Sequence, residues 1–192
     1  MLKSLTIILS LSCFILSGCS MGLDKEEYIT WVSSYENGLH VRQKHGEFVF
    51  DVQYQPPEYV YLLQNGHLPS TAEEKEGLVV LSDMQYYKLS VGLSDQNKDF
   101  ISWNTNSKGQ RDKKKHYFSY QFEKDIWLED EGKRYPCQLF HYEQSIDLKP
   151  SRTFVLAFEN PNGGSEGSKL MIDAEWTGSP VMIRVNKQGP DF

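Results

Sequence analysis

The feature that most constrains the fold of this chain is a recurring alternation of apolar and polar side chains. Phe48, Phe50 and Val52 would share one face of an extended segment, while Asp51 and Gln53 would share the other. The same period recurs in residues 87–93, 118–122, 154–158, 170–176 and 181–185. A period of two places successive side chains on opposite faces of a β-strand, one face against a core and the other in solvent. The sequence therefore predicts a mainly β chain.

Turn-forming residues separate these segments. Asn37-Gly38 is a tight-hairpin signal, and it predicts a hairpin between strands at residues 28–35 and 39–44. Gln55-Pro56-Pro57 is expected to end one strand, and Asp130-Glu131-Gly132-Lys133 to turn another. Short strands at roughly 8–12-residue spacing are typical of a sandwich or barrel. We expect an antiparallel β-sandwich, Ig-like or jelly-roll-like, as a single domain over residues 28–192.

Two segments depart from simple alternation. Ser70 followed by Glu73 matches a capping box, with Leu78 and Leu81 on one face after it, and predicts one short helix of about three turns. Residues 59–63 are apolar at successive positions, so both faces of a strand there would be apolar. We expect that strand to be covered on both sides.

The N-terminus has the pattern of an export signal. Lys3 precedes an apolar run at residues 5–16, which has about the length of a signal-peptide core and is too short to span a bilayer as a helix. An ordinary secretion signal would end in an A-x-A-like site, whereas here the small residues stand directly before Cys19. Leu16-Ser17-Gly18-Cys19 resembles the lipobox of bacterial lipoproteins.

This resemblance implies a place of action. Residues 1–18 would be removed as a signal peptide. Cys19 would carry the lipid, which would include a palmitate chain, and residues 19–27 would form a short tether. The protein would be anchored to the bacterial envelope. Ser20 replaces the Asp of an inner-membrane retention signal, which favours the outer membrane if the cell is Gram-negative, facing either the periplasm or the surface.

Charge and cysteine content further restrict which partners and which cysteine chemistry are expected. The 192 residues carry a formal net charge of −6, and loss of residues 1–18 removes one cation, Lys3, to give −7. A mildly acidic chain is a poor ligand for nucleic acid, so no nucleic-acid partner is expected. Cys13 would leave with the signal and Cys19 would be a thioether, so Cys137 would be the lone thiol. We expect Cys137 to be a small buried residue of a strand.

Candidate catalytic and metal motifs lack their structural context. Gly163-Gly164-Ser165-Glu166-Gly167 matches G-x-S-x-G, but a strand-like run follows it where a nucleophile elbow needs a helix. Asp95, Asn97 and Asp99 have the spacing that opens a calcium loop, but Phe100 stands where that loop needs glycine. His40 is expected to face solvent. No catalytic, cofactor or metal residue is assigned, and we expect a protein that is not an enzyme.

Two surface features remain as binding candidates. A basic run is expected to lie in a loop, either simply solvated or in contact with lipid phosphates, an acidic glycan or an acidic partner. Its members are Lys108, Arg111, Lys113, Lys114 and Lys115. Aromatic residues make up 13% of the chain, more than an ordinary domain needs, and we expect most to fill the core. Three that would stack on a sugar if exposed are Trp31, Trp103 and Trp127.

These observations favour a membrane-anchored lipoprotein that is a non-catalytic accessory or protein-interaction subunit of the envelope. A glycan-binding surface lipoprotein is the alternative, and it needs exposed, coplanar aromatic rings. An envelope hydrolase is a third class, and it needs paired carboxylates in a cleft.

Overall fold

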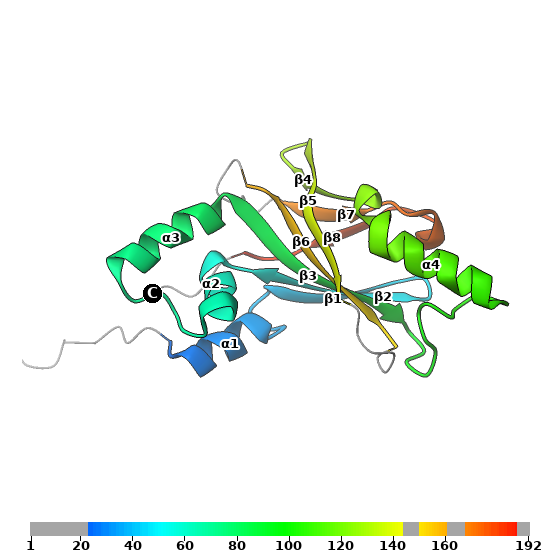
Figure 1. The fold of residues 1–192 in the computed structure, drawn as a ribbon, viewed down its shortest axis with the longest axis horizontal. Coiled ribbons are helices and arrows are strands. Elements are labelled where there is room, and N and C mark those ends of the chain that lie inside the picture. The colour runs from blue at the N-terminus through cyan, green and yellow to red at the C-terminus, as the bar shows by residue number, and fades with distance from the viewer. Residues whose placement is uncertain (1–22, 144–149, 161–167, 188–192) are drawn as a thin grey trace, which may run out of the picture.

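The protein is described by a computed structural model that covers residues 23–143, 150–160 and 168–187. Its strands form one antiparallel sheet in the order β1-β2-β3-β6-β5-β4-β7-β8, as Figure 1 shows. The strands are β1 (His40–His45), β2 (Phe48–Gln55), β3 (Met84–Leu93), β4 (Ile126–Asp130), β5 (Lys133–Glu143), β6 (Arg152–Glu159), β7 (Lys169–Ile172) and β8 (Val181–Arg184). The prediction of a mainly β chain is confirmed.

The sheet is nearly closed, because its first and last strands meet. The backbone N–H of Asn186, just after β8, donates to the carbonyl of Gly38, just before β1, at 3.0 Å. Gly38 has φ +80°, and a Cβ at this position would lie 2.8 Å from the Cβ of Asn186. The eight strands thus curl into one barrel-like sheet, and the predicted sandwich of two sheets is not confirmed.

Aromatic side chains fill the interior of this curled sheet. An eight-stranded barrel is just wide enough for its interior to be filled by side chains. The ring of Trp176 lies 4.9 Å from that of Phe48, 5.6 Å from Phe118 and 5.7 Å from Phe122, at angles typical of edge-on or tilted packing. Trp176 itself is partly buried, and fully buried rings of the core include Phe50, Phe100 and Phe154. The large aromatic content therefore serves the core, as the sequence predicted.

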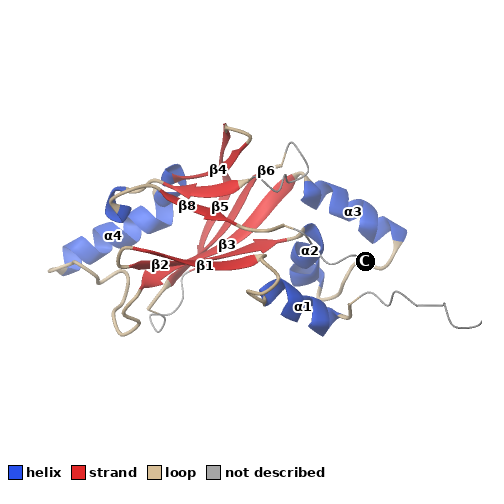
Figure 2. Cartoon of the chain, turned by 180° about the vertical axis from the view of Figure 1, so that it is seen from behind, coloured by secondary structure: helices blue, strands red, loops and turns tan. Residues whose placement is uncertain are grey.

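Helices cover the two ends of the sheet. They are α1 (Lys25–Ser33), α2 (Pro57–Asn65), α3 (Ala72–Ser82) and α4 (Lys108–Tyr120), with short 3₁₀ turns at Phe122–Asp125 and Glu175–Thr177. Figures 1 and 2 show α1, α2 and α3 together at one end and α4 at the other. The prediction of a single helix is wrong, since the described residues contain four α-helices. Within that part of the chain, no helix has the length and apolar character needed to cross a bilayer.

Residues 28–35, predicted to be a strand, mostly belong to α1. Asp24 caps this helix, since its side chain accepts from the N–H of Glu27 at 2.8 Å while the Glu27 carboxylate accepts from the N–H of Asp24. Tyr28 and Val32, four residues apart, are buried together on one face. Asn37-Gly38 therefore joins a helix to β1 rather than two strands. The helix also includes residues 25–27, which the sequence assigned to the tether.

Residues 59–63 lie within α2 and not in a strand. The helix begins at Pro57, whose fixed φ and missing N–H suit the first helical position. Tyr59, Val60 and Leu62 are buried, and Leu63 is exposed. The predicted end of a strand at Gln55 is confirmed.

Residues 118–122 and the basic run both lie in or beside α4, so the predictions of a strand and a loop there are wrong. Phe118 and Phe122 are buried, whereas Tyr120 between them is 66% exposed.

Two other local predictions are closer to the structure. A helix does follow residue 70, although Thr71 and Glu74 form its capping box instead of Ser70 and Glu73. The predicted turn between β4 and β5 is confirmed, with positive φ at Glu131 and Gly132.

Candidate functional site

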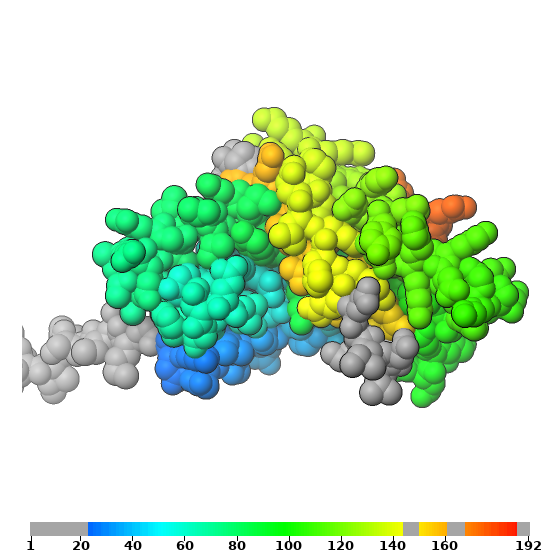
Figure 3. Space-filling view, in the orientation of Figure 1, coloured from blue at the N-terminus to red at the C-terminus, as the bar shows by residue number. Residues whose placement is uncertain are grey.

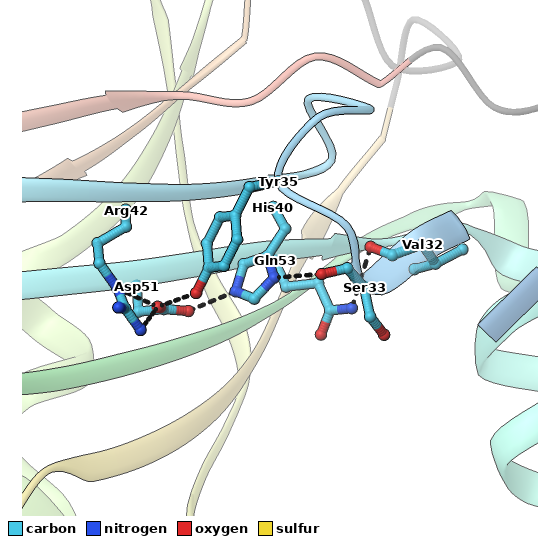
Figure 4. A network of polar contacts seen from close by, with 7 residues as sticks. All are labelled: Val32, Ser33, Tyr35, His40, Arg42, Asp51 and Gln53. Atoms are coloured by element: carbon cyan, nitrogen blue, oxygen red, sulfur yellow. Dashed lines mark hydrogen bonds and ion pairs between the residues drawn. The ribbon is translucent and has the colours of Figure 1, made fainter. Parts of the chain in front are cut away.

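A carboxylate on the outer face of the sheet collects three donors from neighbouring segments. Asp51 of β2 lies opposite Arg42 of β1 in the strand register. Its carboxylate accepts from the Tyr35 hydroxyl at 2.7 Å, from His40 Nε2 at 2.5 Å, and from Arg42 Nε at 2.8 Å and Nη2 at 2.7 Å. Figure 4 shows these side chains converging on Asp51. We refer to Tyr35, His40, Arg42 and Asp51 as the Asp51 cluster.

Hydrogen bonding decides the charge of Asp51. Burial opposes ionisation, but the hydrogen bonds from Tyr35, His40 and Arg42 together hold the pKa of this carboxyl below its usual value. Asp51 is therefore a carboxylate at neutral pH, and it balances the positive charge of Arg42.

His40 is engaged at both ring nitrogens. Its Nδ1 lies 2.8 Å from the carbonyl oxygen of Ser33 at the end of α1, and its Nε2 contacts Asp51. Although it lies on the outer face, as predicted, the His40 side chain is only 16% exposed. With both nitrogens used, it is suited to joining α1 to the sheet rather than to accepting a proton from a substrate.

Tyr35 is held in place although it is exposed. Its ring stacks on the His40 ring with centroids 4.0 Å apart, and the Arg42 guanidinium carbon lies 5.5 Å from the Tyr35 centroid. The hydroxyl is fixed by Asp51, yet 48% of Tyr35 remains exposed. The Arg42 side chain is 58% exposed. The cluster thus presents an aromatic ring and a guanidinium to solvent in fixed orientations.

A groove of about 470 Å³, lined by both polar and apolar residues, adjoins the cluster on the face of β2 and β3. Besides cluster members, its lining includes hydroxyl and amide side chains, namely Ser90, Ser94, Gln96 and Ser151. Such groups donate and accept hydrogen bonds, so the groove suits a polar backbone or side chain of a bound molecule.

The three tryptophans chosen from the sequence lie apart. Trp31 is half-buried on α1, whereas the carbonyl of Trp103 accepts from Lys114 of α4, at the opposite end of the sheet. Trp127 lies on β4, beneath the Arg134 guanidinium, whose carbon is 4.4 Å from a Trp127 ring centroid. They do not form one aromatic strip.

The basic run divides between an inward and an outward face of α4. Lys114 Nζ donates to the carbonyls of Phe100 and Trp103 at 2.8 and 3.0 Å, and burial lowers its pKa to about 8. The other members, Lys108, Arg111, Lys113 and Lys115, are exposed. Lys113 and Trp103 line a shallow cavity of about 350 Å³ beside Trp176. This is where a predicted aromatic and a predicted basic residue come together.

The acidic residues with calcium-like spacing have other partners. Asp99 Oδ2 lies 2.5 Å from Arg152 Nη2, and its Oδ1 accepts from the N–H of Ser102 at 2.8 Å. Asp95 pairs with Lys98 at 3.5 Å. Across residues 23–143, 150–160 and 168–187, no three His, Cys, Asp or Glu side chains gather where they would hold a metal ion.

Cys137 lies on β5, as predicted, but is only half-buried. Its Sγ donates to the Leu139 carbonyl at 3.0 Å, and burial raises the pKa of the thiol to about 11. The reactive thiolate is therefore scarce at neutral pH.

Two sequence predictions fall outside the described residues: Cys19 with the signal peptide, and the G-x-S-x-G segment at residues 163–167. The chain matches no protein family, no curated protein and no solved structure.

Proposed function

We propose that this chain is a lipoprotein anchored to the bacterial envelope through Cys19, and that its folded part binds a protein partner instead of catalysing a reaction. The Asp51 cluster carries the binding proposal. Tyrosine and arginine are enriched among the residues that dominate protein–protein affinity. Tyr35 and Arg42 are exposed and already fixed by Asp51 and His40, so binding would lose less side-chain entropy than with mobile side chains.

The groove beside the cluster supports the same proposal. Its hydroxyl and amide groups would satisfy polar groups of a partner that lie around Tyr35 and Arg42. A non-catalytic role is favoured because both nitrogens of His40 already have partners. Anchoring rests on the lipobox resemblance at Leu16-Ser17-Gly18-Cys19.

The test compares Tyr35→Ala with Tyr120→Ala. Cross-linking of the lipidated protein in its native envelope, followed by mass spectrometry, should identify one stoichiometric protein partner. Tyr35→Ala should weaken capture of that partner at least about fivefold, because truncation of a dominant contact costs more than about 1 kcal/mol. Tyr120 is an exposed tyrosine on α4, so Tyr120→Ala should leave capture unchanged.

Equal capture by the two variants would refute binding through the cluster. Recovery of the wild-type protein without any protein partner would refute the proposal and favour the glycan reader. The cavity beside Trp103 and Lys113 would then be examined first.

A further inference from the structure

We infer that the end of the domain carrying α1, α2 and α3 lies against the lipid bilayer, with Leu63, Val79 and Val80 among the headgroups. This inference rests on the proposed acylation of Cys19, and it specifies which surface of the protein the anchor holds against the membrane. It concerns the end of the sheet opposite α4 (Figures 1 and 2), which is the blue-to-teal end of the space-filling view (Figure 3).

The short connection between Cys19 and the fold is the first argument. Leu23 is partly buried and packs against the core, so the fold begins there. Only Ser20, Met21 and Gly22 separate it from Cys19. A chain spans at most about 3.6 Å per residue, so Leu23 would lie within about 14 Å of the acylated cysteine. The surface around Leu23 must then lie close to the bilayer.

The second argument is what surrounds this attachment point. Lys25, two residues after Leu23, donates from Nζ to the carbonyl of Gly66 at 2.8 Å. Gly66 ends α2, and its N–H donates to the carbonyl of Leu62. Leu63 lies in this last turn of α2 and is 59% exposed. The exposed Leu63 therefore lies in the helical turn next to the Gly66 carbonyl that Lys25 contacts.

The third argument is the apolar surface of α3. None of its residues is buried, and Val79 and Val80 are 66% and 72% exposed. Residues 78–81 are all apolar and successive positions on a helix differ by about 100°, so this turn is apolar on nearly every side. Val80, Val79 and Leu63 are the most exposed large aliphatic residues of the described chain. Single exposed apolar residues are ordinary, but a contiguous apolar surface such as the turn at residues 78–81 is typical of a contact with a membrane or a protein.

The position of the anchor selects the bilayer as the occupant of this surface, and charge selects the type of lipid. The first half of α3 carries Glu73, Glu74 and Glu76 against one cation, Lys75. Anionic headgroups would repel this half, whereas zwitterionic headgroups would not. The expected contact is therefore with neutral lipid, driven by burial of the aliphatic side chains.

The test places a fluorescent label at either end of the lipidated protein. In a Cys137→Ser background, Val79→Cys is labelled in one sample and Tyr120→Cys in another. These two positions have the same exposed fraction, 66%. The proteins are reconstituted into phosphatidylcholine vesicles that contain a brominated quencher lipid. The label at position 79 should be quenched severalfold more strongly than the label at position 120. Adding Leu63→Gln and Val80→Gln should remove most of that difference.

The possible outcomes distinguish a failure of the bilayer contact from a failure of acylation at Cys19. Protein that floats with the vesicles but shows equal quenching at both positions would refute the contact and leave acylation standing. Protein that does not float, and behaves like Cys19→Ser, would refute acylation and with it the contact. A label at position 79 that is shielded from an aqueous quencher but not reached by the lipid quencher would assign this surface to a second copy of the chain, and would also overturn the inference.

Discussion

The carboxylate of Asp51 links its own strand, β2, to two other segments. Tyr35 belongs to the connection after α1, while His40 and Arg42 belong to β1. A further contact nearby runs from the Gln53 amide to the carbonyl of Val32 at 3.2 Å, which also links β2 to α1 (Figure 4). The cluster therefore holds α1 on the sheet in addition to orienting Tyr35.

Removal of the Asp51 charge should lower stability in a pH-dependent way. The pKa of Asp51 is lowered in the folded state, so its contribution is fully present above the unfolded pKa of about 3.9 and is lost as pH falls through the folded pKa. Asp51→Asn should cost about 1–2 kcal/mol at pH 7, since the replaced contacts include charged hydrogen bonds at a partly exposed site. Urea unfolding at pH 7 and pH 3 should show the difference from wild type shrinking at pH 3. Asp112→Asn on exposed α4 is the control, and an equal loss there would contradict a specific role for Asp51.

Only part of the Asp51 cluster could be predicted from the sequence. Alternation correctly placed Asp51 and His40 on the outer face of their strands. The pairing of Arg42 with Asp51 depends on the β1–β2 register, which was not predicted. Tyr35 was assigned to a strand, so its return over His40 could not be anticipated. Cross-strand opposite charges near residues 42 and 51 were the one available signal.

At the level of elements, short aromatic-rich runs caused the errors. Phe118 and Phe122 fit a helix as well as they fit an alternating strand, because a spacing of four is common to both patterns. Two start signals mark the helices that alternation does not reveal: Asp24 with Glu27, and Pro57 at the first helical position. The strand over Val181–Arg184 was predicted well because it buries one face and exposes the other. In Phe48–Gln55 buried and half-buried positions alternate only as far as Val52, and Gln53, predicted to face solvent, is buried.

The helix caps should differ in what they stabilise. Thr71→Ala removes the cap of α3, a helix with no buried residue, so it should raise hydrogen exchange within α3 about fivefold while leaving global unfolding unchanged. Asp24→Ala removes the cap of α1, which buries Tyr28 and Val32 in the core, and should lower the global free energy of unfolding by about 1 kcal/mol. Hydrogen-exchange mass spectrometry and urea titration measure the two effects. If Thr71→Ala lowered global stability as much as Asp24→Ala, α3 would have to be coupled to the core.

For the molecule as a whole, the decisive feature is that the sheet curls until its ends meet. The contact between Asn186 and Gly38 joins segments almost 150 residues apart in the sequence. No local pattern encodes such a pairing, since each strand specifies which face is apolar but not which neighbour it takes. This is why alternation predicted a β-rich chain but could not choose between two sheets and one.

Closure of the sheet should depend on Gly38. Gly38→Ala places a Cβ in a left-handed backbone conformation and 2.8 Å from the Asn186 Cβ. Gly66→Ala introduces the same kind of conformational strain, φ +81°, with no atom within 4 Å of the new Cβ. The strain alone costs about 1–2 kcal/mol, so Gly38→Ala should be the more destabilising in urea titration. It should also speed hydrogen exchange in β8. Equal effects of the two substitutions would mean that closure contributes little.

The meeting of the first and last strands also sets the order in which the chain acquires its structure. β1 cannot find its β8 neighbour until the C-terminal residues have been synthesised and, if the chain is exported, carried across the membrane. Native contacts between distant parts of a sequence slow folding. Until β8 lies beside β1, nothing from the C-terminal strands restricts access of other chains to the β1 edge. Folding of this protein should therefore be late and slow, and the interval before closure is when it is most exposed to aggregation.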